Sequence, residues 1–293
     1  MPPSTVSNCN SQTQIGSTVT RLRDCFQSLK AAGRKAVIPY VVAGDPQRDT
    51  TVPLMHRLVE AGADVLEIGV PFSDPMSEGP VIQLGHERAL ANGISLRDVL
   101  AMVASFRERN QHTPVVVMGY ANPVERMGYG AFADACAAAG VDGLITVDLP
   151  PEEVATLNTE LKRVQLDNIF LISPTTPDAR ISTITAEASG FIYYVAVKGV
   201  TGAGNLDADD VAQYLERIRL TTSLPVCVGF GIKDAASAAS VAHFADGVVV
   251  GSALIDTVAK AMASGADEAQ ATEQALALLH DIRSGVDGVA SAA

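Results

Sequence analysis

The sequence of 293 residues has few charged residues, and the basic ones are in the minority. It contains 21 Lys and Arg against 33 Asp and Glu, and charged residues make up only 18% of the chain, so its formal net charge is −12. A surface of this sign repels the phosphates of nucleic acids and anionic lipids. The composition therefore argues against nucleic acid and anionic membrane as main partners. A bound anion would have to be held by backbone amides or a few local donors.

Cysteine and long hydrophobic runs are also scarce. Cys9, Cys25, Cys136 and Cys227 form no CxxC pair, and no histidine stands at the spacing of a metal site. We therefore expect no metal and reduced, mostly structural thiols, as in a cytoplasmic protein. No segment approaches the roughly 18 uninterrupted apolar residues of a membrane span. Residues 1–20 lack the basic start and apolar centre of a signal peptide.

No internal linker divides the chain into parts. Residues 20–285 are therefore predicted to form one domain, which is within the length of a single barrel. We expect the polar residues 1–19 to form a disordered tail and residues 286–293 to be frayed.

Eight short apolar runs rich in β-branched residues alternate with amphipathic segments. The runs lie at 36–43, 64–69, 114–120, 143–148, 169–173, 191–197, 225–230 and 246–251. Their starts are about 30 residues apart, which is the length of one strand–helix unit, so the pattern predicts an α/β fold, the (β/α)8 TIM barrel. Leu22, Phe26 and Leu29, at helical spacing, predict an extra N-terminal helix over the bottom of the barrel. The alternative is a doubly wound open sheet, but no GxGxxG follows the first run.

An acidic loop follows the second predicted strand. The strand ends at Glu67, and the loop VPFSDPMSEGP (70–80) contains Asp74 and Glu78. Active sites of such barrels lie at the carboxyl ends of the strands, where a carboxyl group is partly desolvated and its pKa rises toward the range of acid–base catalysis. From spacing alone, Glu67 could equally be a structural residue that pairs with a base or caps a helix.

Glycine-rich segments follow the last three predicted strands. They are GVTGAG (199–204), GFGI (229–232) and the Gly251–Ser252 pair that opens a helix. Backbone amides in such loops and at helix N-termini bind phosphate. We therefore predict a phosphorylated small molecule whose phosphate lies opposite Glu67. Other strand-end residues could line a flat apolar pocket, namely Tyr40, Met118, Tyr120 and Tyr193, with Ile82 and Phe230 nearby. None of the five histidines is assigned a role.

These segments resemble the tryptophan synthase alpha subunit family from about Thr20 onward. The most specific motif is LEIGVPFSDPMSEGP (66–80), and IPYVVAGDP, MGYANP, VDLPPEE, YYVAVKGVTGAG, GFGI and VVVGSA occur in the family's order. The resemblance implies retro-aldol cleavage of indole-3-glycerol phosphate to indole and glyceraldehyde 3-phosphate in tryptophan biosynthesis. It also implies an α2β2 complex with a beta subunit that binds its own pyridoxal phosphate, and no cofactor in this chain.

The resemblance also assigns roles to individual residues. Glu67 and Glu78 are expected to be catalytic, and Asp74 is expected to face the partner. The expected substrate contacts are Tyr40, Ile82, Tyr120, Tyr193, Thr201 and Phe230, and the expected phosphate contacts are Gly202, Gly231, Gly251 and Ser252.

Glu78 departs from the family's pattern, which has Ala-Asp-Gly-Pro where this chain has Ser-Glu-Gly-Pro. The charge is kept, but the side chain is one methylene longer, and a displacement of about 1 Å can cost roughly a hundredfold in rate. A weakly active or non-catalytic alpha-like regulatory subunit therefore stays open as an alternative. So does a barrel aldolase that forms a Schiff base on Lys198, just past the sixth strand.

Overall fold

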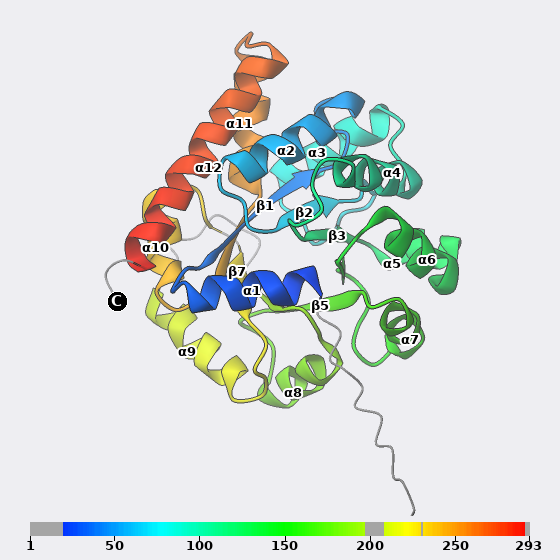
Figure 1. The fold of residues 1–293 in the computed structure, drawn as a ribbon, viewed down its shortest axis with the longest axis vertical. Helices are drawn as coiled ribbons and strands as arrows, with labels where there is room; N and C mark the ends of the chain where they lie inside the picture. Colours follow the sequence, from blue (N-terminus) through cyan, green and yellow to red (C-terminus); the bar gives the residue numbers. More distant parts are fainter. Residues whose placement is uncertain (1–19, 197–207, 230, 291–293) are drawn as a thin grey trace, which may run out of the picture.

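The computed structural model describes residues 20–196, 208–229 and 231–290. Eight parallel strands pair in chain order, and β1 also pairs with β8, so the barrel is closed and the predicted TIM barrel is confirmed. Figure 1 shows the helices arranged around the strands, with α1 lying across them in front. The strands are β1 (Ala36–Val42), β2 (Leu66–Gly69), β3 (Val115–Gly119), β4 (Gly143–Thr146), β5 (Asp167–Ile172), β6 (Ile192–Val195), β7 (Val226–Gly229) and β8 (Gly247–Val250).

Seven of the eight predicted apolar runs contain a whole strand, and the run at 169–173 overlaps β5, which begins two residues earlier at Asp167. The helices are α1 (Arg21–Ala31), η1 (a 3-10 turn, Arg48–Thr50), α2 (Thr51–Glu60), α3 (Pro80–Ala91), α4 (Leu96–Arg107), α5 (Ala121–Met127), α6 (Tyr129–Ala139), α7 (Ala155–Arg163), α8 (Asp178–Glu187), α9 (Ala208–Arg219), α10 (Ala235–Ala242), α11 (Ser252–Ala263) and α12 (Glu268–Ala290).

Helix α1 is the predicted extra helix. The side chain of Thr20 caps it by accepting a hydrogen bond from the backbone N–H of Arg23. Leu22, Phe26 and Leu29 are buried against inward-facing residues of the strands. This packing closes the amino-terminal end of the barrel, so a ligand can enter only from the other end.

Strand alternation decides which side chains face the barrel interior. In β1, Ala36 and Ile38 belong to the interior cluster, and just before β2 Val65 belongs to it too. Successive side chains of a strand point to opposite faces, so Tyr40 and Glu67 point inward as well. They are register partners across the β1–β2 pair. Two inward polar side chains therefore lie side by side near the carboxyl ends of their strands.

The C-terminal prediction needs a correction. Fraying was expected from residue 286, but α12 runs to Ala290, and Val286 is fully buried. Gly285 lies so close to the backbone of Ala235 in α10 that any side chain there would clash. Gly285 thus permits close packing of α12 on α10, in a segment that the sequence predicted to fray.

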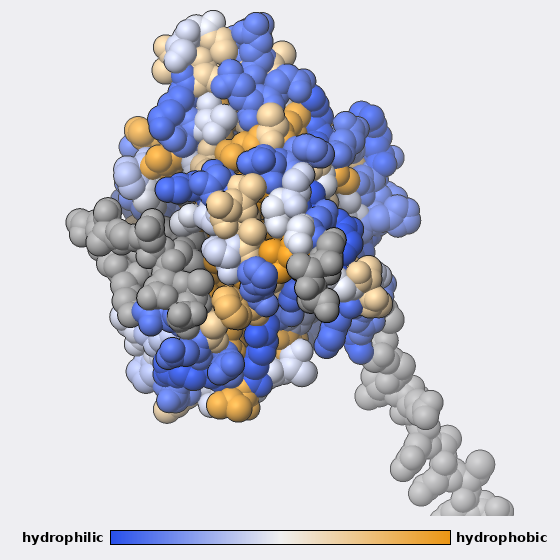
Figure 2. Space-filling model, turned by 90° about the vertical axis from the view of Figure 1, so that its left-hand side faces the viewer, coloured by the Kyte–Doolittle hydropathy of each residue, from blue (hydrophilic) through white to orange (hydrophobic). Residues whose placement is uncertain are grey.

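The visible surface is mostly hydrophilic. On the face shown in Figure 2, hydrophobic residues lie in small groups among hydrophilic ones. Within the described residues, no single helix is long and apolar enough to cross a membrane. Only α3 and α4 together reach that length and composition, and they are bent by 93° relative to one another.

A buried ion pair ties α4 to the start of β4. Arg107 donates to Asp142 Oδ2 at 2.6 Å, and the same oxygen accepts the backbone N–H of Val115 at 2.7 Å. Both charged side chains are less than a tenth exposed. Removing one partner of such a pair leaves the other charge buried and uncompensated.

We therefore expect Asp142→Ala to lower the free energy of unfolding by about 3 kcal/mol or more, and the melting temperature by roughly 6 °C or more. Asp134→Ala, which removes an exposed partner of Arg163, is the matched control and should change stability by about 1 kcal/mol at most. Thermal unfolding followed by circular dichroism measures both. Equal shifts for the two variants would contradict the assignment.

Candidate active site

One pocket opens at the carboxyl ends of the strands. It holds about 540 Å³ of empty space, part of it continuous with solvent, which is within the usual size of small-molecule sites. Its lining comes from strands β1, β2, β3, β6 and β8 and from the segments that follow β2, β7 and β8. The residues are Tyr40, Glu67, Ser77, Glu78, Ile82, Met118, Tyr193, Gly231, Ile232, Val249, Gly251 and Ser252.

Glu67 is the most deeply placed acid of the pocket. Its side chain is 1% exposed, and neither carboxyl oxygen has a hydrogen-bond partner among the described residues. Burial, and secondly the neighbouring Glu78, raises the pKa of Glu67 from 4.5 to about 8. A carboxyl group with this pKa is mostly protonated at neutral pH, so it can donate a proton and then take one back.

Glu78 is held more firmly than Glu67. The hydroxyl of Tyr120 donates to Glu78 Oε2 and accepts the backbone N–H of Ser77. The backbone of Glu78 is also fixed, since its carbonyl accepts a hydrogen bond from the Gln83 side chain at 2.9 Å. Burial raises the pKa of Glu78 to about 7, although the hydrogen bond from Tyr120 opposes this rise. The two carboxyl groups therefore change charge near neutral pH, and each resists ionisation while the other is charged.

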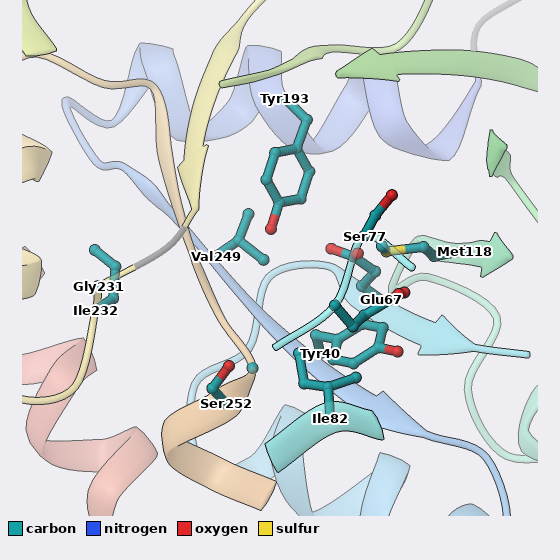
Figure 3. Close-up of a pocket in the computed structure, with 12 residues that line it drawn as sticks. Tyr40, Glu67, Ser77, Ile82, Met118, Tyr193, Gly231, Ile232, Val249 and Ser252 are labelled. Carbon is teal, nitrogen blue, oxygen red and sulfur yellow. The ribbon is translucent and has the colours of Figure 1, made fainter. Parts of the chain in front are cut away.

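Two tyrosines extend the pocket wall, and glycines make room for them. The hydroxyl of Tyr193 occupies the space that a side chain at Gly229 would need, and Tyr40 does the same at Gly69. In Figure 3, Tyr40, Tyr193 and Glu67 project into the same space. Gly229, at the end of β7, thus leaves room for the ring of Tyr193, which the sequence alone did not reveal.

A helix N-terminus lies at the other side of the pocket. Gly251 is the N-cap of α11 and Ser252 is its first residue, and Figure 3 places Ser252 and Gly231 across the pocket from Glu67. The first N–H groups of a helix have no partner within the helix and carry a positive dipole end. A Cβ at Gly251 would lie 3.0 Å from the ring of Tyr40, so a larger residue at this position would press on that ring.

The structure brings most of the predicted site residues together. Nine of them line the pocket, namely Tyr40, Glu67, Glu78, Ile82, Met118, Tyr193, Gly231, Gly251 and Ser252. Tyr120 does not line it but lies behind Glu78, where its ring stacks on Phe72. Asp74 is exposed on the loop after β2. Four residues lie outside the described part of the chain: Lys198, Thr201, Gly202 and Phe230.

Sequence reasoning missed Ser77, Ile232, Val249 and, above all, His86. His86 is 2% exposed and its Nε2 lies 3.4 Å from Tyr40 Oη and 3.9 Å from Glu78 Oε1. Its spacing of four residues after Ile82, on the helix that follows the acidic loop, was the signal that could have found it. Within the described residues no group of three or more His, Cys, Asp or Glu side chains is arranged to hold a metal ion.

Fold and pocket together define a TIM-barrel enzyme with two buried carboxyl groups in one pocket at the carboxyl ends of its strands. Comparison with known proteins gives the family. Residues 26–284 match the model of the tryptophan synthase alpha chain. The chain belongs to this family, which is the lyase subunit of tryptophan synthase and acts in tryptophan biosynthesis.

Individual relatives agree with the family model. The chain is 60% identical over 242 residues to the tryptophan synthase alpha chain of Thioalkalivibrio sulfidiphilus, covering 83% of this chain and 91% of that protein. It is 53% identical over 273 residues to that of Marinobacter nauticus, covering 93% and 100%. The crystal structure of tryptophan synthase subunit alpha from Legionella pneumophila superposes with a TM-score of 0.85 at 46% identity, covering 92% of this chain and 100% of that one.

The raised pKa of Glu67 predicts a pH-dependent effect on stability. The folded protein binds this proton more tightly than the unfolded chain, so ionisation makes the folded state lose stability as pH rises from about 4.5 through about 8. Glu67→Gln should therefore stabilise the protein more at pH 8.5 than at pH 5.5, by on the order of 1–3 kcal/mol. Thermal unfolding at both pH values measures the difference, with the exposed Glu108→Gln as control. An equal effect of Glu67→Gln at both pH values would show that Glu67 is not neutral in the folded state.

Proposed function

We propose that the pocket cleaves indole-3-glycerol phosphate to indole and glyceraldehyde 3-phosphate, with Glu67 as the acid–base group and Glu78 as the electrostatic one. The observation that carries this proposal is the pair of buried carboxyl groups with raised pKa values in one pocket. The reaction needs one proton delivered to indole C3 and one removed from the hydroxyl of the adjacent side-chain carbon. A single carboxyl group that begins neutral performs both transfers.

The steps balance without another reagent. Glu67 gives its proton to indole C3, and the ring becomes an indoleninium ion with positive charge at its nitrogen. The Glu67 carboxylate then takes the hydroxyl proton, the carbon–carbon bond breaks, and its electron pair restores the aromatic ring. The side chain leaves as the aldehyde, and Glu67 is neutral again. The first transfer charges both the ring and Glu67, so a second carboxylate that stabilises the ring cation lowers the barrier.

Glu78 is suited to this second task in spite of its extra methylene. Tyr120 donates a hydrogen bond to one carboxyl oxygen, and hydrogen bonds to a carboxylate favour its ionised form. The contact also fixes the longer side chain in one orientation. These contacts favour a catalytic Glu78 over the alternative of a non-catalytic regulatory subunit.

The substrate's phosphate fits the opposite side of the pocket. Gly251 and Ser252 place the N-terminus of α11 there, and helix N-termini bind phosphate through backbone N–H groups. Tyr40 and Tyr193 would flank the flat indole ring between the two ends. Thr201, Gly202 and Phe230 keep their expected roles as part of the same proposal.

A beta subunit is the proposed partner, in an α2β2 complex located in the cytoplasm. The loop after β2 exposes Asp74 and Met76, and Met76 is 79% exposed although its side chain is apolar. Leu84 on α3 is a second exposed apolar side chain at this end of the barrel. An apolar group on an acidic loop beside the site suits a subunit interface. The pyridoxal phosphate of the complex would belong to the beta subunit.

We expect Glu67→Gln to lower the rate of indole release from indole-3-glycerol phosphate by about 10² to 10⁴-fold, the usual contribution of a general acid–base group. Substrate affinity, measured by calorimetry on this inactive variant, should stay within about threefold because the carboxyl group acts in the transition state. Glu108→Gln, an exposed change at the far end of the barrel, is the control. Full activity of Glu67→Gln would overturn the assignment.

The departure at Glu78 has its own test. We expect the unaltered chain, assayed with a beta subunit, to turn over at least as fast as Glu78→Asp, because the shorter acid is drawn away from Tyr120. Glu78→Gln should lose about a hundredfold, as other electrostatic contacts do. If only Glu78→Asp is active, the chain is a regulatory subunit that binds the phosphate ligand.

The interface is tested by Met76→Lys. This change places a charge on the exposed apolar loop and should weaken binding to a beta subunit at least tenfold in calorimetry. Leu220→Lys is the matched control, since Leu220 is 86% exposed but follows α9 at the amino-terminal end of the barrel. Equal binding of both variants would place the interface elsewhere.

A further inference from the structure

His86 is a buried imidazole beside the two carboxyl groups, and the steps above give it no task. It lies on the inner face of α3 with Ile82 and Gly85, and its side chain is 2% exposed. Burying a polar ring costs free energy unless its nitrogen atoms find partners. The partners of each nitrogen therefore indicate what this side chain does.

The hydrogen bond at His86 Nδ1 determines which ring nitrogen carries the proton. The backbone N–H of Phe72 donates to His86 Nδ1 at 3.0 Å, and a nitrogen that accepts a hydrogen bond carries no proton. Burial lowers the pKa of His86 to about 4, so the ring is neutral at physiological pH. A neutral imidazole with an unprotonated Nδ1 carries its hydrogen on Nε2.

The hydrogen on His86 Nε2 points toward Tyr40 and Glu78. His86 Nε2 lies 3.4 Å from the Tyr40 hydroxyl oxygen and 3.9 Å from Glu78 Oε1. The other oxygen of the same carboxyl group, Oε2, already accepts the hydroxyl of Tyr120. Glu78 thus stands between two donors from different elements, one on α3 and one at the end of β3.

We propose that His86 is a positioning residue for Glu78, in which Nδ1 anchors the loop after β2 while Nε2–H donates to Glu78 Oε1 during the reaction. A shift of about 1 Å brings 3.9 Å to hydrogen-bond distance. Such contacts commonly tighten when substrate binds. The indoleninium charge draws Glu78 into its ionised form, and an ionised carboxylate is the stronger acceptor.

The length of the Glu78 side chain explains why a hydrogen bond from His86 would matter. A glutamate has one more rotatable bond than an aspartate, so a second side-chain donor restricts its carboxyl group further than Tyr120 does alone. Two donors on two oxygens hold the plane of the carboxylate toward the pocket. This role deepens the proposed function and rests on the part assigned there to Glu78.

Two substitutions distinguish the contribution of His86 Nδ1 from that of Nε2. His86→Asn keeps an acceptor near Nδ1 for the Phe72 amide but loses the donor at Nε2. His86→Gln keeps a donor near Nε2 but loses the acceptor for the loop. The readouts are kcat and KM for indole release across pH 5–9, with melting temperatures to verify folding.

We expect His86→Asn to lower kcat about tenfold with KM within about twofold, and to move the acidic limb of the kcat profile upward by about half a pH unit or more. His86→Gln should keep kcat within about threefold and leave that limb in place. The other ionisable groups that face Glu78 are unchanged in both variants, namely Glu67 on β2, Tyr40 on β1, Tyr193 on β6, Tyr120 after β3 and Asp148 after β4.

Three results from the His86 variants themselves would overturn the role of His86. They are unchanged kcat and pH profile in His86→Asn, an effect in His86→Gln alone, or equal losses in both variants that follow their melting temperatures. Unchanged activity of Glu78→Gln would instead remove the proposed role of Glu78 and this inference with it. An inactive Glu78→Gln beside a fully active His86→Asn would overturn the inference about His86 alone.

The unaltered chain offers a test that does not depend on folding of variants. Imidazole ¹⁵N shifts should show His86 neutral, with Nε2 protonated and Nδ1 not, from pH 5.5 to pH 9. A proton on Nδ1, or a cationic ring at pH 7, would overturn the proposal.

Discussion

Two carboxyl groups are buried in one pocket, and among the described residues no lysine or arginine forms an ion pair with either. Burial of an unpaired charge is expensive, so such groups stay neutral until something offsets the charge. This constraint gives Glu67 its proton at neutral pH and keeps Glu78 close to ionisation. A cationic intermediate in the pocket would supply the missing positive charge. The negative charge of these carboxyl groups on ionisation is therefore opposite to the positive charge that the proposed reaction develops on the ring.

The packing of the barrel interior confines the buried carboxyl groups to the carboxyl ends of the strands. Leu22, Phe26 and Leu29 fill its amino-terminal end, and apolar strand residues fill its middle. At the carboxyl ends, inward positions carry the tyrosine hydroxyls and the carboxyl group of Glu67 beside apolar residues such as Met118 and Val249. Stability comes from the closed half of the barrel, while the open half holds groups that are costly to bury.

The acid at residue 78 shows how a departure from a family pattern can be accommodated. The carboxyl group of Glu78 accepts a hydrogen bond from the hydroxyl of Tyr120, whose ring stacks on Phe72. Phe72 in turn donates its backbone N–H to His86. The loop after β2, the end of β3 and the inner face of α3 are thus joined around one carboxylate. These contacts restrict the orientation of the longer side chain.

The sequence by itself determined the fold, because eight apolar runs about 30 residues apart leave few ways to bury every run. It also predicted that Glu67, Gly231 and the Gly251–Ser252 pair lie at one end of the barrel, as the structure shows. Only the tertiary structure decided that Tyr120 stands behind Glu78, that Gly229 makes room for Tyr193, and that residues 286–290 continue a helix. It alone revealed His86, whose two contacts come from segments 14 and 46 residues away in the chain. Periodicity fixes which face of an element is buried, but contacts between elements depend on register and crossing geometry that no local pattern contains.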